Sequence, residues 1–205
     1  MIKPSDCTII VPHLGQSEES IYALDQCLTS LYETVPGMKN IIAMNGIDPD
    51  REDTWDHIPQ KDINLILLEE QGQCKAVNAA AATVNTPWIF VTNDDMVYAP
   101  GWWERMEWFE GFANSKGQKP MCVSPQLVEP KKGAPTFIEY FCGGAGGDFD
   151  KAKWLEFAKD PKNKGGRRTG FNLPFLIKKE ILDIISTYDI QYDPWGSNSD
   201  SDLEY

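Results

Sequence analysis

Two adjacent carboxylates, Asp94 and Asp95, are the strongest sign of chemistry in the sequence. They follow the run 88–92, whose apolar, β-branched and aromatic composition is typical of a buried strand. Ligands of open α/β sheets bind beyond the carboxyl ends of the strands, and hard oxygen ligands at such a place suit Mg²⁺ or Mn²⁺. Taken alone, the pair is equally consistent with a solvated turn, because Asp and Asn favour turns for local hydrogen-bonding reasons.

A second acidic cluster lies close to the end of the chain. It comprises Asp193, Asp200, Asp202 and Glu204. If the fold brought this cluster near Asp94 and Asp95, the like charges would repel one another unless a cation lay between them. The two clusters together therefore favour a bound divalent cation.

The elements that must position these groups alternate between strand and helix in the first half of the chain. Short apolar runs predict buried strands, and apolar residues at spacings of three and four predict helices that cover them. The predicted strands are 7–11, 41–44, 63–68 and 88–92, and the predicted helices begin after Ser17, at Gln73 and at Pro100. This alternation implies an α/β fold with a mainly parallel central sheet and helices on both faces. The second half is richer in Gly, Pro and Lys, with helices predicted over 151–159 and 178–186.

Composition restricts the classes of partner. Lys and Arg total 19 against 31 Asp and Glu, which gives a net charge of −12. Nucleic acid is disfavoured as the main partner because most of the surface would repel a polyanion. No apolar run approaches the roughly 20 residues that span a bilayer, and no signal peptide is visible. The five cysteines form no C-x-x-C pair, and two histidines exclude a multi-histidine metal site. These features favour a cytoplasmic protein, either free or peripheral to a membrane.

The order of the motifs resembles the donor half of a family 2 glycosyltransferase of the GT-A fold. Gly72, Ala76 and Asn78 match that family's G-x-x-x-A-x-N segment, and Asn93-Asp94-Asp95 falls on its D-x-D position. Pro100-Gly101-Trp102 matches the helix start that follows. The resemblance covers roughly residues 6–110 and returns at the end of the chain. It implies a single GT-A domain over 1–205, with a Rossmann-like nucleotide-sugar half over about 1–115 and a smaller, irregular acceptor half over about 116–205.

The resemblance also implies an activity and a mechanism. A family 2-like enzyme of this kind is an inverting glycosyltransferase, here of hexosyltransferase type, which moves a sugar from a nucleotide diphosphate sugar to a hydroxyl of a carbohydrate or glycoconjugate. Asp95, with help from Asp94, would hold Mn²⁺ or Mg²⁺ against the diphosphate. The segment 200–203 resembles the family's acidic D-x-D-L-like segment, which places the catalytic base at Asp200 with Asp202 as a supporting carboxylate. The alternative interpretation of this segment is a frayed acidic tail.

Further contacts to the donor are expected from residues that match the family's binding loops: Pro12, His13, Asn45, Gly72, Lys75, Asn78, Asn93 and Asp94. His13 would stack on or hydrogen-bond the base unless it is a surface residue without a role. Lys75 would reach the diphosphate unless it is a solvated lysine on an Ala-rich helix. Met44-Asn45-Gly46 stands where the family often has an Asp that reads the base, so a UDP-sugar is only slightly favoured over a GDP-sugar. Asn93 occupies the first D-x-D position, so metal ligation would rest chiefly on Asp95.

Two other functions stay open at this point. A sugar-phosphate nucleotidyltransferase is also an α/β, metal-dependent enzyme, but its first loop is usually Gly-rich and basic, whereas 12–16 holds one Gly and no Lys or Arg. A non-catalytic nucleotide-sugar-binding module is the other alternative, favoured by Asn93 and by the position of Asp200 so close to the last residue. Family members usually continue past this point, so the sequence is either a domain of a longer protein or an unusually compact enzyme.

Overall fold

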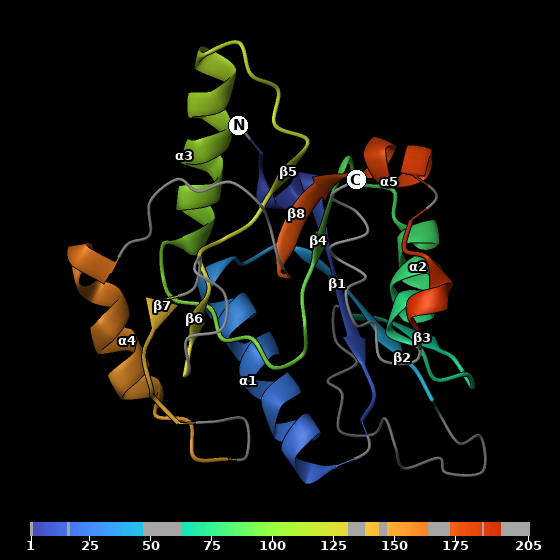
Figure 1. Ribbon diagram of the computed structural model, residues 1–205, viewed down its shortest axis with the longest axis horizontal. Coiled ribbons are helices and arrows are strands. Elements are labelled where there is room, and N and C mark those ends of the chain that lie inside the picture. Colours follow the sequence, from blue (N-terminus) through green and yellow to red (C-terminus); the bar gives the residue numbers. More distant parts are fainter. Residues whose placement is uncertain are drawn as a thin grey trace.

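The central sheet has six strands, and helices cover both of its faces (Figure 1). The computed structural model describes residues 2–15, 17–46, 63–130, 138–143, 147–163, 173–185 and 187–193. Within these ranges the strand order is β3-β2-β1-β4-β8-β5, and a separate two-stranded sheet pairs β6 with β7. The predicted α/β class with a mainly parallel sheet is therefore confirmed.

Four strands run parallel and correspond to the four predicted apolar runs. They are β1 (Cys7–His13), β2 (Lys39–Met44), β3 (Ile63–Leu67) and β4 (Trp88–Val91). The strands β5 (Cys122–Val123) and β8 (Phe175–Lys178) complete the sheet, and β8 runs antiparallel to both β4 and β5. Strand–helix alternation does not predict this reversed strand, because β8 enters the sheet from the second half of the chain.

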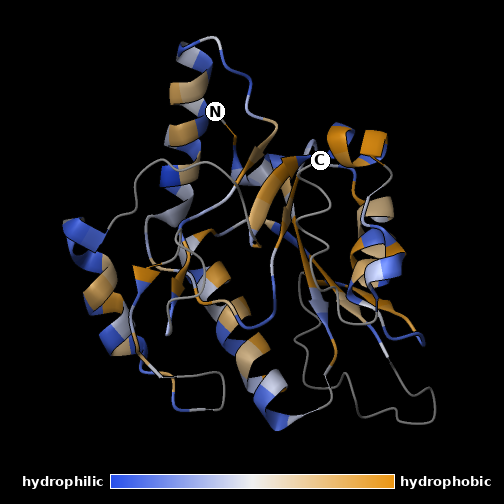
Figure 2. Ribbon diagram, in the orientation of Figure 1, coloured by the Kyte–Doolittle hydropathy of each residue, from blue (hydrophilic) through white to orange (hydrophobic). Residues whose placement is uncertain are grey.

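Side-chain alternation along the strands builds a core on each face of the sheet. Ile9 and Val11 of β1 point into one core, whereas Ile10 points into the other, and each of these side chains is at most 1% exposed. A strand buried on both faces needs apolar residues at consecutive positions, which explains why these runs are continuous rather than alternating. Figure 2 shows these apolar strands at the centre of the molecule, between helices of mixed hydropathy.

Helices α1 (Glu18–Thr34) and α3 (Trp102–Ser115) pack on the first face. Ser17 begins α1 because its hydroxyl accepts a hydrogen bond from the backbone N–H of Ser20 at 3.1 Å. Leu24, Leu28 and Leu31 then place one apolar stripe of α1 against the sheet. The helix predicted to open at Pro100 begins at Trp102 instead, because Gly101 adopts a left-handed conformation with φ 87° and acts as its N-cap.

Helices α2 (Gln73–Thr83) and α5 (Lys179–Ile185) pack on the second face, and both agree with the predicted ranges to within a residue. Ala76 and Ala80 of α2 are fully buried, so small side chains bring this helix close to the sheet. In the second half, α4 (Lys151–Lys159) lies beside β6 (Val128–Glu129) and β7 (Ile138–Glu139), apart from α2 and α5 (Figure 1). The division of one domain into a donor half and an acceptor half stays a prediction.

Candidate active site

A polar pocket with a volume of about 270 Å³ opens at the carboxyl edge of the parallel strands. Its walls come from the ends of β1, β2 and β4 and from the residues around the start of α2. They are Pro12, Leu14, Asn45, Gln71, Gln73, Asn93, Asp94 and Asp95. Five of the predicted donor or metal residues therefore line one pocket. His13 and Gly72 contact lining residues, whereas Lys75 and Asn78 lie on α2 outside the lining. We call this the carboxylate pocket.

Asn45 braces the back of the carboxylate pocket. Its side-chain nitrogen donates to the backbone oxygen of His13 at 3.1 Å, and its side-chain oxygen accepts from the backbone N–H of Gly72 at 3.1 Å. Asn45 is only 5% exposed. The side-chain amide of Asn45 thus ties the ends of β1 and β2 to the start of α2. This structural role is separate from the contact with the base that the sequence predicts for Asn45.

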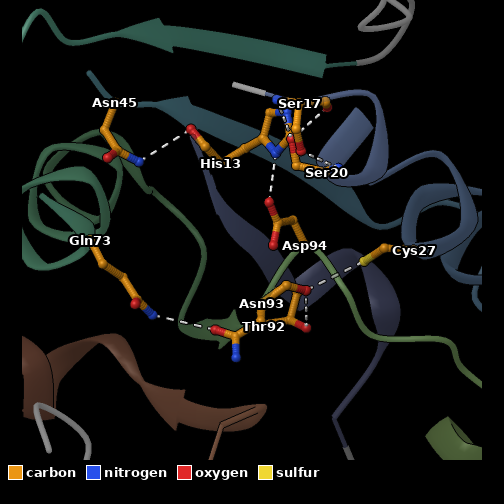
Figure 3. Close-up of polar contacts among 9 residues, drawn as sticks. All are labelled: His13, Ser17, Ser20, Cys27, Asn45, Gln73, Thr92, Asn93 and Asp94. Atoms are coloured by element: carbon orange, nitrogen blue, oxygen red, sulfur yellow. Dashed lines mark hydrogen bonds and ion pairs between the residues drawn. The ribbon is translucent and has the colours of Figure 1, made fainter. Parts of the chain in front are cut away.

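His13 contacts a carboxylate rather than the open pocket. Its Nδ1 lies 2.6 Å from Oδ2 of Asp94, and its side chain is fully buried, whereas the side chain of Asp94 is 25% exposed (Figure 3). Gly15 allows this burial, since it has φ +62° and a Cβ there would lie 3.2 Å from Nε2 of His13. A buried ring offers no open face on which a base could stack. The geometry therefore gives His13 the part of orienting Asp94.

Asn93 is held by hydrogen bonds to its side chain and to its backbone oxygen. Its side-chain oxygen accepts a hydrogen bond from Nε2 of Gln73 at 3.3 Å, and its backbone oxygen accepts from the Sγ of Cys27 at 3.6 Å and from Oγ1 of Thr92 at 3.0 Å (Figure 3). These contacts fix the turn that follows β4. Asp94 and Asp95 consequently leave the strand in a defined direction toward the carboxylate pocket.

Asp95 is the carboxylate best suited to hold a divalent cation. Partial removal from water raises the pKa of Asp95, and the neighbouring charge of Asp94 raises this pKa further. A cation beside the pair would relieve both effects. One oxygen of Asp94 is already engaged by His13, whereas Asp95 makes no such contact to a histidine among the described residues, so Asp95 is the stronger candidate ligand. The described residues contain no cluster of three or more metal-binding side chains. Two carboxylates nevertheless fit Mg²⁺ and Mn²⁺, which usually take one or two of them together with phosphate oxygens and water.

The G-x-x-x-A-x-N segment at the start of α2 holds the stretch 188–193. The carboxylate of Asp193 accepts hydrogen bonds from the backbone N–H groups of Cys74 at 2.8 Å and Lys75 at 3.1 Å, so it caps the start of α2. Gly72 makes room for this carboxylate, because a Cβ there would lie 2.6 Å from Cγ of Asp193. Asn78 exchanges two hydrogen bonds with the backbone of Tyr188, at 2.8 and 3.0 Å.

Lys75 forms an ion pair with Glu70 on the surface beside the carboxylate pocket. The hydrogen bond that Lys75 donates to the carboxylate of Glu70 raises the pKa of Lys75, so the lysine stays charged. Asp200 and Asp202 lie outside the described residues. Asp193 is fixed at the start of α2, the helix whose first residue, Gln73, lines the carboxylate pocket. Spacing alone does not reveal this anchor, since it joins positions 119 residues apart.

A second pocket, of about 330 Å³, shares one lining residue, Asp95, with the first. Its lining includes Glu129 and the aromatic side chains of Tyr22, Trp102, Tyr140 and Trp154. We call it the aromatic pocket. Burial raises the pKa of Glu129, and the charge of Asp95 raises that pKa further, so the two carboxyl groups interact. Sequence reasoning missed Glu129 and Trp154, because neither belongs to a motif. Among the described residues, no helix is long and apolar enough to cross a bilayer.

A family model supports the resemblance inferred from the motifs. Residues 8–107 match the model described as glycosyl transferase family 2. The matched segment contains the predicted donor and metal residues from Pro12 to Asp95, and it ends inside α3. The family 2 resemblance is thereby confirmed for the part of the chain that carries the carboxylate pocket. No curated protein sequence matches the chain.

Solved structures share the fold at low sequence identity. Residues 1–349 of TarS from S. aureus match with a TM-score of 0.62 and 12% identity over 97% of this chain and 53% of that one. The complex of the same TarS segment with UDP-GlcNAc gives 0.58 and 12% over 92% and 49%. The mannosyltransferase PcManGT from Pyrobaculum calidifontis, in complex with GDP-Man and Mn²⁺, gives 0.54 and 15% over 99% and 54%. The predicted GT-A fold is confirmed, and the chain spans about half the length of these structures.

Proposed function

We propose that the protein is a glycosyltransferase that uses a nucleotide diphosphate sugar. The family 2 sequence pattern and the GT-A fold support this proposal. The observation that carries this proposal is the pair Asp94 and Asp95 at the carboxyl end of β4, in a polar pocket within the matched segment. Similar structures bind UDP-GlcNAc or GDP-Man, which supports a nucleotide sugar as donor and leaves both bases open. The transferred group would be a hexose.

The donor would lie in the carboxylate pocket with its diphosphate near Asp95. Asp95 would hold Mn²⁺ or Mg²⁺, and this cation would neutralise the charge that develops on the departing diphosphate. The presence of Mn²⁺ in the complex of PcManGT supports this choice. His13 would keep Asp94 in place, and Asn45 and Gln73 would hold the pocket walls at a fixed separation. The binding energy then goes into orienting the anomeric carbon rather than into ordering these side chains.

The catalytic base would be Asp200, supported by Asp202. Asp200 would take the proton of the acceptor hydroxyl while its oxygen forms a bond to the anomeric carbon. The bond from that carbon to the diphosphate breaks in the same displacement, so the nucleoside diphosphate leaves and the configuration inverts. The anchor at Asp193 supports this role, since it fixes the chain close to the carboxylate pocket shortly before Asp200.

Analysis of the released products tests the reaction class. UDP-GlcNAc and GDP-Man are incubated with Mn²⁺ and the protein, and the nucleotide products of slow hydrolysis or transfer are separated. We expect release of UDP or GDP. In a parallel incubation with UTP or GTP and a sugar 1-phosphate, release of pyrophosphate would instead indicate nucleotidyl transfer. The absence of turnover in both incubations, with a bound donor, would indicate a non-catalytic module. For transfer, Asp200→Asn should retain donor binding and lose turnover, whereas Asp183→Asn, on the surface of α5, should change neither.

A further inference from the structure

We propose that the aromatic pocket binds the acceptor as a neutral sugar, and that Glu129 and Trp154 recognise its hydroxyl groups. The inference rests on the proposed function and names the substrate class of its second site. The occupant would meet the donor at Asp95, the residue that lines both pockets. Neither residue belongs to the segment that matches the family model.

The lining of the aromatic pocket has the chemistry that recognises carbohydrates. Tyr22 and Gln26 come from α1, Trp102 from the start of α3, Tyr140 from the residue after β7, and Trp154 from α4. Figure 1 shows α1, α4 and the β6–β7 pair together on one side of the molecule, away from α2 and α5. Aromatic rings cover the apolar C–H faces of a sugar, and the few polar groups among them fix its orientation.

The charge of the lining selects against an anion. Asp95 and Glu129 are acidic, and the described residues that line the pocket include no Lys, Arg or His. A phosphate or a diphosphate would therefore meet repulsion with no compensating cationic side chain. A polyhydroxyl ligand would not, because its O–H groups donate hydrogen bonds to carboxylates. The pocket thus fits a neutral sugar better than the nucleotide end of the donor.

Two polar groups of the lining, the indole of Trp154 and the carboxylate of Glu129, would be stabilised by such a ligand. The indole Nε1–H of Trp154 is buried and has no hydrogen-bond acceptor among the described residues. Buried indole N–H groups normally have an acceptor, and a sugar hydroxyl oxygen would provide one. Glu129 is partly withdrawn from water and interacts unfavourably with Asp95, so hydroxyl donors would stabilise its charged form. The ring of Trp154 is itself held in place by Phe157, which stacks on Tyr140 with centroids 4.0 Å apart.

Binding of simple glycosides tests the proposal. The probes are methyl α-D-mannopyranoside, methyl β-D-glucopyranoside, methyl β-D-galactopyranoside and methyl N-acetyl-β-D-glucosaminide, titrated in the presence of Mn²⁺ and saturating UDP or GDP. Quenching of intrinsic fluorescence reports occupancy, since Trp102 and Trp154 line the pocket. We expect at least one glycoside to bind, and both Glu129→Gln and Trp154→Phe to weaken it by about tenfold, the usual loss for a hydrogen bond to a charged or buried group.

Matched controls come from the same elements or residue types. Glu139 pairs with Glu129 in the β6–β7 sheet but is exposed and does not line the pocket, so Glu139→Gln should bind like the wild type. Trp108 is 60% exposed on α3, so Trp108→Phe should also leave the affinity unchanged. Circular dichroism of all four variants checks that each retains the fold.

The outcomes separate this inference from the proposed function. If UDP or GDP binds with Mn²⁺ and no glycoside binds, the inference fails and the proposed function stands. If a glycoside binds and neither nucleotide does, the pocket takes a sugar but the proposed function fails, and the acceptor assignment fails with it. If Glu129→Gln weakens a nucleotide sugar while sparing both the free nucleotide and the glycosides, the pocket holds the donor's sugar, which overturns the acceptor assignment.

Discussion

At the scale of residues, the contact between His13 and Asp94 explains how two adjacent carboxylates can take different parts. A fully buried imidazole holds one oxygen of Asp94 at 2.6 Å, whereas Asp95 stays beside both pockets. The sequence indicates that His13 and Asp94 both belong near the site. It does not reveal their pairing, because they are 81 residues apart and the contact depends on β1 and β4 being neighbours in the sheet.

Replacement of His13 tests whether it positions Asp94. His13→Phe retains most of the buried volume but removes the Nδ1 contact, and we expect Mn²⁺-dependent nucleotide binding to weaken about tenfold, in line with the loss of a hydrogen bond to a charged group. His13→Asn places a side-chain nitrogen near the same point and should recover part of that loss. Calorimetry on both variants measures the effect. Equal weakening in the two variants, each with an unchanged fold, would mean that the ring only fills space.

The raised pKa of Asp95 gives donor binding a pH dependence. A cation binds the deprotonated carboxylate, so metal-dependent binding should be complete above this pKa and lost as the pH falls through it. Because partial removal from water and the charge of Asp94 raise the pKa of Asp95, the loss should occur at a higher pH than the usual Asp value of about 3.9. Titrations at graded pH measure the midpoint, with Mn²⁺ held well below its dissociation constant so that competition with the proton does not lower it. A midpoint at or below the usual value would contradict this environment for Asp95.

At the scale of elements, helix α2 links the carboxylate pocket to the stretch 188–193. Gly72 gives space to Asp193, Asn78 binds the backbone of Tyr188, and Ala76 is buried against the sheet. The G-x-x-x-A-x-N residues are therefore explained by packing and by attachment of a distant segment. The periodicity of the sequence predicts the helix itself, whereas the residues that bind to it come from more than 100 positions away.

Removal of the Asp193 cap should affect turnover more than donor binding. Asp193→Ala removes two hydrogen bonds at the start of α2, which should lower the free energy of unfolding by about 1 kcal/mol. It also releases the segment before Asp200, so we expect kcat to fall while the affinity for the nucleoside diphosphate changes little. Denaturant unfolding, calorimetry and turnover measure the three quantities.

A second capping residue provides the control for that experiment. Asp160→Ala removes a cap from the helical turn at 161–163, where Asp160 accepts a hydrogen bond from the backbone of Lys162 at 2.9 Å. This variant should lose stability without a matching loss of kcat. If the loss of kcat relative to the loss of stability were the same in both variants, Asp193 would serve stability alone.

At the scale of the whole molecule, much of the architecture follows from the sequence, whereas most of the contacts between the residues of the site do not. Continuous apolar runs predict the four parallel strands, because both faces of this sheet are covered. The antiparallel strand β8 and the aromatic pocket depend on contacts between the two halves of the chain, which local patterns do not encode. Part of the net charge of −12 is concentrated at the site, since Asp94, Asp95 and Glu129 line two pockets that share Asp95.

Calorimetric titration of UDP and GDP, each with and without Mn²⁺, tests the central claim most directly. The claim predicts that at least one of these nucleotides binds only when Mn²⁺ is present. It also predicts that Asp95→Asn abolishes this binding while Asp183→Asn, on the surface of α5, leaves it intact. Binding of neither nucleotide, or binding that is indifferent to both Mn²⁺ and Asp95→Asn, would contradict a metal-assisted nucleotide-sugar site at the end of β4.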